Sequence, residues 1–227
     1  MASSNAFVPA LLVIDMQEDF CPPSGALQVS DGRTIIPLIN TLLSSPSFAL
    51  RIATKDDHPP NHISFASQHA PPNNVPFEST ITITNPLNPS QTQVSRVWPD
   101  HCIQGTLGNQ FVSELDVSNV QVVRKGQDAR LEMYSVFCDP FGVAKSEAAD
   151  LLRAKGVTHV YCVGLAADYC VKYTALDSVK EGFETYIIRE GTKAVDQERL
   201  ENCYAEIEKQ GVRVVHIDSE EVRRVMA

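Results

Sequence analysis

Six short runs of apolar and β-branched residues recur along this 227-residue chain. They are residues 11–15, 49–55, 120–124, 159–164, 185–189 and 212–217. Their apolarity is nearly continuous, as in strands buried on both faces of a parallel sheet. Amphipathic segments lie between or after them, and each is followed by a glycine: residues 146–155, 168–181 and 196–210. This alternation predicts an α/β fold, a three-layer, doubly wound and mostly parallel six-stranded sheet of Rossmann-like form.

The length suits one α/β domain, so we expect residues 1–227 to form a single domain. Residues 57–100 interrupt the pattern, because they hold eight of the fourteen prolines and many polar residues. Within them, only residues 80–84 have weak strand character. Long irregular inserts in compact domains are usually functional or disordered, and we expect this one to cover the site.

The charge balance excludes several classes of partner. There are 28 acidic and 19 basic residues, a net charge of −9, and no cluster of Lys and Arg. Nucleic acid and anionic membrane surfaces are therefore not expected, whereas a small molecule is. Six cysteines without a CxxC pair indicate reduced thiols and a cytoplasmic protein, and we expect neither a signal peptide nor a membrane span. A nuclear or peroxisomal location and a homo-oligomer stay open.

Polar residues follow four of the apolar runs. Asp15 ends the first run, Asp56 and His58 follow the second, Lys125 follows the third, and a small-residue turn after the fourth leads to Cys170. Ligand crevices of parallel sheets lie at the carboxyl ends of the strands. These side chains are therefore expected at one edge of the sheet.

A thiol, an ammonium and a carboxylate at that edge suit nucleophilic catalysis. Cys170 lies at the start of a helix, where free N–H groups favour a thiolate and can bind an oxyanion. Lys125 would stabilise the thiolate, and Asp15 would accept the thiol proton and return it to a leaving group. Taken singly, each residue has an ordinary alternative: a core thiol, a solvated lysine and a loop carboxylate.

A metal site is predicted separately. Asp56 and His58 lie two apart in an extended segment and project to the same side, whereas Asp57 points away. With His101 they form a carboxylate and two imidazoles, which suit Zn²⁺ or a similar divalent ion. The alternative is ordinary loop histidines. Two histidines of the insert lack this spacing and are expected at the surface or behind the ligands: His62 and His69.

Five motifs occur in order: residues 12–20 (LVIDMQEDF), 56–59 (DDHP), 98–102 (WPDHC), 125–126 (KG) and 164–171 (GLAADYCV). Together they resemble the nicotinamidases (pyrazinamidases), in particular the yeast type, of the isochorismatase-like cysteine hydrolase superfamily. The resemblance runs from residue 11 to about residue 190. It departs at Asp57, where the family usually has Trp, so the ring contact expected from that Trp is in doubt and a negative charge is added near the ion.

The resemblance implies the isochorismatase-like form of the α/β fold and a role for each matching residue. They are a catalytic triad of Asp15, Lys125 and Cys170; metal ligands Asp56, His58 and His101; oxyanion-hole N–H groups of Ala166 and Cys170; and substrate-pocket residues Phe20, Tyr134 and Leu165. It also implies a cis peptide between Leu165 and Ala166. Tyr134 could equally be a plain core residue.

The activity implied is metal-dependent hydrolysis of nicotinamide to nicotinate and ammonia through a cysteine thioester, in NAD salvage, with Zn²⁺ as the expected ion. Two alternatives stay open. One is another amide or carbamoyl hydrolase, or an isochorismatase, of the same superfamily. The other is a ligand-binding member without turnover. A thiol redox protein is disfavoured, because Cys170 has no resolving cysteine nearby in sequence.

Overall fold

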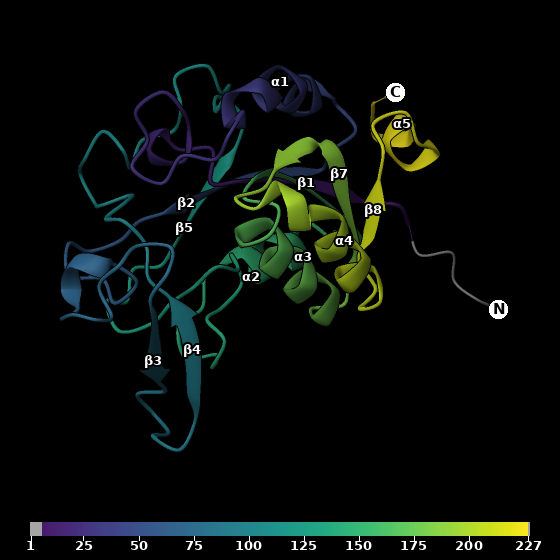
Figure 1. Ribbon diagram of the computed structural model, residues 1–227. Helices are drawn as coiled ribbons and strands as arrows, with labels where there is room; N and C mark the ends of the chain where they lie inside the picture. The colour runs from purple at the N-terminus through teal and green to yellow at the C-terminus, as the bar shows by residue number, and fades with distance from the viewer. Residues whose placement is uncertain (1–5, 227) are drawn as a thin grey trace.

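A six-stranded parallel sheet forms the centre of the molecule, in a computed structural model that describes residues 6–226 (Figure 1). Its strands are β1 (Pro9–Ile14), β2 (Leu50–Asp56), β5 (Gln121–Lys125), β6 (His159–Leu165), β7 (Glu184–Lys193) and β8 (Arg213–Val215). They lie in the order β5-β2-β1-β6-β7-β8, and every pair is parallel. The predicted six-stranded parallel sheet is therefore confirmed.

Helices cover both faces of the sheet, which gives the predicted three layers (Figure 1). On one face, α1 (Ile36–Ser44) and α5 (Glu220–Met226) pack with Leu11 and Val13 of β1. On the other face, α2 (Ala148–Ala154), α3 (Cys170–Lys180) and α4 (Leu200–Glu208) pack with Leu12 and Ile14. Alternate side chains of one strand thus enter separate cores. The sequence did not predict α1 or α5; α1 begins without a side-chain cap.

The strand order reverses between β1 and β6. From β1 the chain continues outward to β2 and β5, whereas from β6 it continues outward in the opposite direction to β7 and β8. Connections leave such a switch point on opposite sides, so a crevice opens at the carboxyl ends of these two strands. Gly164 lets β6 approach β1 there, because its φ is +112° and an added Cβ would overlap the carbonyl of Ile14.

The insert between residues 57 and 100 contains an antiparallel hairpin of β3 (Thr80–Thr84) and β4 (Thr92–Arg96), which projects from the body of the molecule (Figure 1). The weak strand signal at residues 80–84 corresponds to β3, whereas β4 was not predicted. The hairpin buries Ile83 and Ser95 and exposes the threonines on its outer face. Because little apolar area is buried, the sequence pattern of β4 is polar and uninformative.

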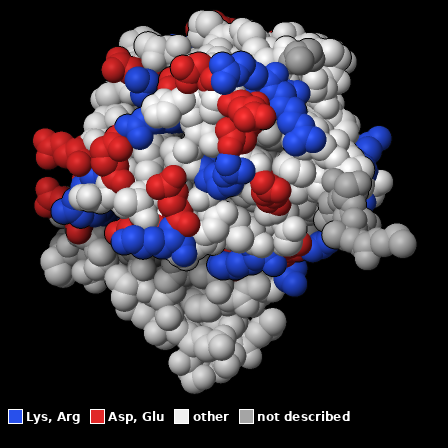
Figure 2. Space-filling model, turned by 90° about the vertical axis from the view of Figure 1, so that its right-hand side faces the viewer, with Lys and Arg blue, Asp and Glu red and all other residues white. Residues whose placement is uncertain are grey.

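The surface shows no field of a single sign on the face drawn in Figure 2, where basic and acidic side chains are interspersed. No charged side chain is visible on the lower projection of that view. No helix within residues 6–226 is both long enough and apolar enough to cross a membrane. The expectations about the two ends of the chain rest partly on residues 1–5 and 227, which lie outside the described range.

Candidate active site and metal site

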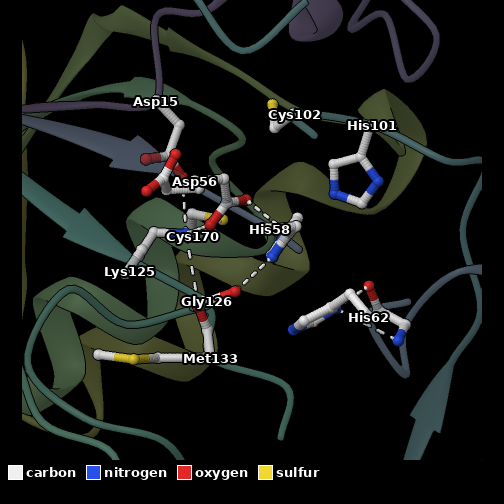
Figure 3. A network of polar contacts seen from close by, with 12 residues as sticks. Asp15, Asp56, His58, His62, His101, Cys102, Lys125, Gly126, Met133 and Cys170 are labelled. Carbon is white, nitrogen blue, oxygen red and sulfur yellow. Dashed lines mark hydrogen bonds and ion pairs between the residues drawn. The ribbon is translucent and has the colours of Figure 1, made fainter. Parts of the chain in front are cut away.

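Lys125 lies at the centre of the buried polar group at the carboxyl edge of the sheet (Figure 3). Its Nζ is 2.9 Å from Asp15 Oδ2, 2.5 Å from Asp56 Oδ1 and 3.4 Å from Cys170 Sγ. A further contact of 3.4 Å joins Nζ to the carbonyl of Met133. Three strand ends and one helix start thus bring together the carboxylates, ammonium and thiol that the sequence placed at one edge.

Asp15 directly follows β1 and adopts a left-handed backbone conformation with φ +50°. Its Oδ1 accepts a hydrogen bond of 2.5 Å from Thr54 Oγ1, which fixes the carboxylate. Burial raises the pKa of Asp15, although the Lys125 ammonium opposes this shift. A carboxylate that is more basic than usual suits a group that must take a thiol proton.

Cys170 is the first residue of α3 and is buried in the same group. Burial raises the pKa of its thiol well above the usual range, Lys125 lowers it, and the charges of Asp15 and Asp56 raise it further. Lys125 is therefore the cation that favours the thiolate. The peptide bond between Leu165 and Ala166 is cis, as the resemblance implied.

Asp56, His58 and His101 present ligand atoms that all lie within 4.8 Å of one another. Nδ1 of His58 is 2.8 Å from the carbonyl of Gly126, and Nδ1 of His101 is 2.7 Å from the carbonyl of Pro99. Each Nδ1–H is thus held by a carbonyl, and each Nε2 is left as the lone-pair donor, as in metal-binding histidines. These residues fit a divalent ion.

Asp15, Asp56 and Cys170 also lie close enough together to hold an ion. The Lys125 ammonium already contacts all three, at 2.9, 2.5 and 3.4 Å. A second cation there would meet this charge directly. The arrangement with Asp56, His58 and His101 is therefore the metal site that the described residues offer.

Asp57 points away from Asp56, His58 and His101, as the extended-segment geometry predicted. Its carboxylate accepts hydrogen bonds from Gln127 Nε2 at 2.8 Å and from Asn109 Nδ2 at 3.2 Å. Arg124 Nε lies 3.9 Å away on the outer side. The charge that replaces the family's usual Trp is thus compensated outside the site.

His62 is fully buried and stacks on His58, with 4.0 Å between the ring centroids. The prediction of a surface position for His62 is therefore wrong, and the alternative position, behind His58, is correct. Burial, together with the neighbouring His58, lowers the pKa of His62 to about 2, so this ring is neutral. His69 is half-buried, with Nε2 2.7 Å from the carbonyl of Ile63.

A pocket opens beside the Cys170 thiol, Asp56 and His101, with apolar and aromatic walls. It is lined by Phe20, Leu27, Val29, Asp56, Trp98, His101, Glu132, Tyr134, Ala166, Tyr169, Cys170 and Val195. The prediction that Leu165 lines the pocket is corrected by the structure. Leu165 is fully buried in the core on the α1 face and is not among the lining residues. Its side chain projects from the end of β6 toward Gly32 instead.

The sequence analysis assigned no role to several of these pocket residues. Trp98 donates a hydrogen bond of 3.0 Å from Nε1 to Tyr134 Oη and contacts the ring of Tyr169 edge-on, at 4.9 Å between centroids. Glu132 is buried, and its Oε2 has no hydrogen-bond partner among the described residues. Trp98 lies in the same motif as His101, and Tyr169 lies in the same motif as Cys170. Their positions in these motifs could have indicated that they line the pocket. Leu27, Val29 and Val195 carry no local signal.

Residues 9–219 match the family model described as the isochorismatase domain. The chain belongs to the isochorismatase family. It is 38% identical to a nicotinamidase of Acinetobacter baylyi over 206 residues, which cover 90% of each chain. Among solved structures, this family member resembles the yeast nicotinamidase bound to the inhibitor nicotinaldehyde, with a TM-score of 0.87, 31% identity, and coverage of 92% and 100%. It also resembles a pyrazinamidase of Pyrococcus horikoshii in complex with zinc, with a TM-score of 0.70, 35% identity, and coverage of 92% and 98%.

Proposed function

We propose that this isochorismatase-family chain is an amidohydrolase that converts nicotinamide to nicotinate and ammonia. The observation that carries the proposal is the buried Lys125 ammonium, which contacts both the Asp15 carboxylate and the Cys170 thiol. The pocket beside them is lined by aromatic rings that suit a flat heterocycle. The similarity to nicotinamidases over most of the chain supports the choice of substrate.

In the acylation step, Asp15 takes the thiol proton while Cys170 Sγ attacks the amide carbon. Lys125 stabilises the thiolate that this transfer creates. The negative oxygen of the tetrahedral intermediate is held by the N–H groups of Ala166 and Cys170. When the C–N bond breaks, Asp15 returns the proton to the leaving nitrogen, and ammonia departs from a thioester on Cys170.

In the deacylation step, Asp15 takes a proton from water as the water oxygen attacks the thioester carbon. The C–S bond then breaks, the proton held by Asp15 passes to Sγ, and the product leaves as nicotinic acid, which ionises to nicotinate. Asp15 thus acts as base and acid in turn, which its raised pKa favours. Phe20, Trp98 and Tyr134 enclose the ring and hold the amide against the nucleophile.

We assign a divalent ion, Zn²⁺, to Asp56, His58 and His101. When bound, the ion supplies a Lewis-acidic position for the ring nitrogen of the substrate. The ligand set of one carboxylate and two imidazoles suits zinc with open positions. The groups behind the imidazoles support the assignment, because the carbonyls of Gly126 and Pro99 hold the two rings through Nδ1.

The wider setting follows from the same chemistry. We propose one isochorismatase-like domain over residues 1–227, acting in NAD salvage by returning nicotinate from nicotinamide. The six free cysteines suit a reducing cytoplasm.

The test combines metal analysis of protein purified without added ions with coupled detection of ammonia. We expect bound divalent metal and rapid ammonia release from nicotinamide, with slow or no release from an N-carbamoyl amine. Faster turnover of the N-carbamoyl compound would indicate a different amide hydrolase of the family. No ammonia from any amide with metal-replete protein would favour a ligand-binding protein without turnover.

A further inference from the structure

The three metal ligands come from two chain segments that are far apart in the sequence. Asp56 is the last residue of β2 and His58 follows just after it, whereas His101 lies beyond the hairpin and is followed by Cys102 (Figure 3). Backbone hydrogen bonds join the segments directly: the N–H of His58 donates to the carbonyl of Cys102 at 3.1 Å, and the N–H of Gln104 donates to the carbonyl of His58 at 2.9 Å. The relative position of the ligands therefore depends on this junction.

Asn109 adds a side-chain bridge across the same junction. Its Nδ2 donates to the carbonyl of Asp56 at 2.8 Å and to the carbonyl of Cys102 at 2.9 Å. The carboxylate of Asp57 is a third acceptor, at 3.2 Å. One amide group thus contacts a metal ligand, its neighbour Asp57 and the neighbour of another ligand. Asn109 is only 2% exposed, so water does not replace these bonds readily.

Gln17 fixes Asn109 in turn and connects the bridge to the strand end that carries Asp15. Its Nε2 donates to the carbonyl of Asn109 at 3.0 Å and to the carbonyl of Asp56 at 2.8 Å. Its Oε1 accepts from the N–H of Asp56 at 2.8 Å. Gln17 is fully buried. Both amides therefore have their donors used within the network, and each holds one orientation.

We propose that Asn109 is a positioning residue for the metal site: its carboxamide sets the distance between the segment of Asp56 and His58 and the segment of His101. The inference rests on the metal role assigned under the proposed function. The backbone bonds between the segments remain without Asn109, so its loss loosens the ligand set and does not abolish it. Small displacements of ligands are enough to weaken a metal site.

The test is Zn²⁺ affinity, measured by competition with a chromophoric chelator, in wild type and in Asn109→Ala. We expect about tenfold weaker binding in the variant, in the range typical for groups that orient metal ligands. Alkylation of Cys170 by iodoacetamide, located by mass spectrometry in the metal-free proteins, should stay near the wild-type rate, because the side-chain hydrogen bonds of Asn109 go to Asp56, Asp57 and Cys102 and not to Cys170. Asn109→Ser reaches one carbonyl at most and should give a smaller loss. Unchanged affinity in both variants would overturn the proposal.

Asn85→Ala is the matched control. Asn85 is also a buried amide, and it holds the hairpin turn through bonds to Gln91 Oε1 at 2.7 Å and to the N–H of Leu87 at 2.9 Å. It should lose stability on a comparable scale and leave Zn²⁺ affinity unchanged. An equal loss of affinity in this control would show that general destabilisation, and not positioning, weakens the site.

A swap of two residues separates the bridge from the Asp57 contact. In the double variant Asp57→Asn/Asn109→Asp, the side chains at 57 and 109 can still form a hydrogen bond with each other. The carbonyls of Asp56 and Cys102, however, then face a carboxylate that has no hydrogen to donate. We expect affinity to stay low, and recovery to the wild-type value would overturn the carbonyl bridge. Wild-type protein without measurable Zn²⁺ affinity would instead contradict the proposed metal site itself.

Discussion

Replacement of Lys125 by Met removes the cation beside the nucleophile and keeps a side chain of similar length. Nζ is 3.4 Å from Cys170 Sγ. Among the groups that shift the pKa of this thiol most strongly, Lys125 is the one cation. At an effective dielectric constant of about 20, a charge pair at this distance is worth about 5 kcal/mol. The loss of this interaction therefore disfavours the thiolate and raises the pKa of the thiol.

The pKa of Cys170 is expected to rise because every strong contribution that remains after Lys125 is removed also raises it. Burial and the charges of Asp15 and Asp56 all raise the pKa of Cys170, and Lys125 opposes them. Without Lys125, the thiolate fraction near neutral pH should fall by about three orders of magnitude, and the rate of alkylation with it.

The assay is the rate of Cys170 alkylation by iodoacetamide at fixed divalent-metal concentration, with ammonia release measured in parallel. Lys172→Met is the control. Lys172 lies on α3, as Cys170 does, but it forms a surface ion pair with Glu206 at 3.3 Å. Its rate should match that of wild type. A change of less than about threefold in the Lys125 variant would refute the electrostatic argument, which requires a far larger effect. Denaturant unfolding should also show a loss of about 3–5 kcal/mol, because two buried carboxylates lose their cation.

Cys170→Ala should abolish ammonia release while calorimetry still detects nicotinamide binding; retained turnover would contradict a thioester. Gly126→Ala should weaken Zn²⁺ binding and lower stability, because Gly126 has φ +68° and an added Cβ would overlap the ring of His58; a Zn²⁺ titration equal to that of wild type would argue against this contact. Leu12→Ala, at a fully buried position of β1, should cost about 2–5 kcal/mol in urea unfolding, and a loss below that range would mean that the core closes around the cavity. Chelation should lower kcat/KM for nicotinamide, with recovery on adding Zn²⁺; full activity in the chelated protein would contradict the metal site.

The sheet could be predicted because the sequence pattern of each strand is local. A strand buried on both faces needs apolar residues throughout, and the polar residue that ends it is visible in the sequence. Asp15, Asp56 and Lys125 could therefore be assigned to one sheet edge before any tertiary contact was known. The outward direction of Asp57 also followed locally, since alternate residues of an extended segment face opposite sides.

Elements with weak local patterns were not predicted. The helix α1 lacks a polar cap, and β4 is a polar strand whose partner is β3. Local sequence signals do not specify such pairings, because the stabilising contacts come from residues elsewhere in the chain.

The sequence by itself determined the fold class, the sheet edge at which the thiol, ammonium and carboxylates gather, and the spacing that places Asp56 and His58 on one side of their segment. Only the tertiary structure placed His62 behind His58, moved Leu165 out of the pocket and brought Asn109 between two ligand segments. The physical reason is the range of the interactions. Backbone periodicity acts over a few residues, whereas burial and buried hydrogen bonds depend on segments that meet only when the chain has folded.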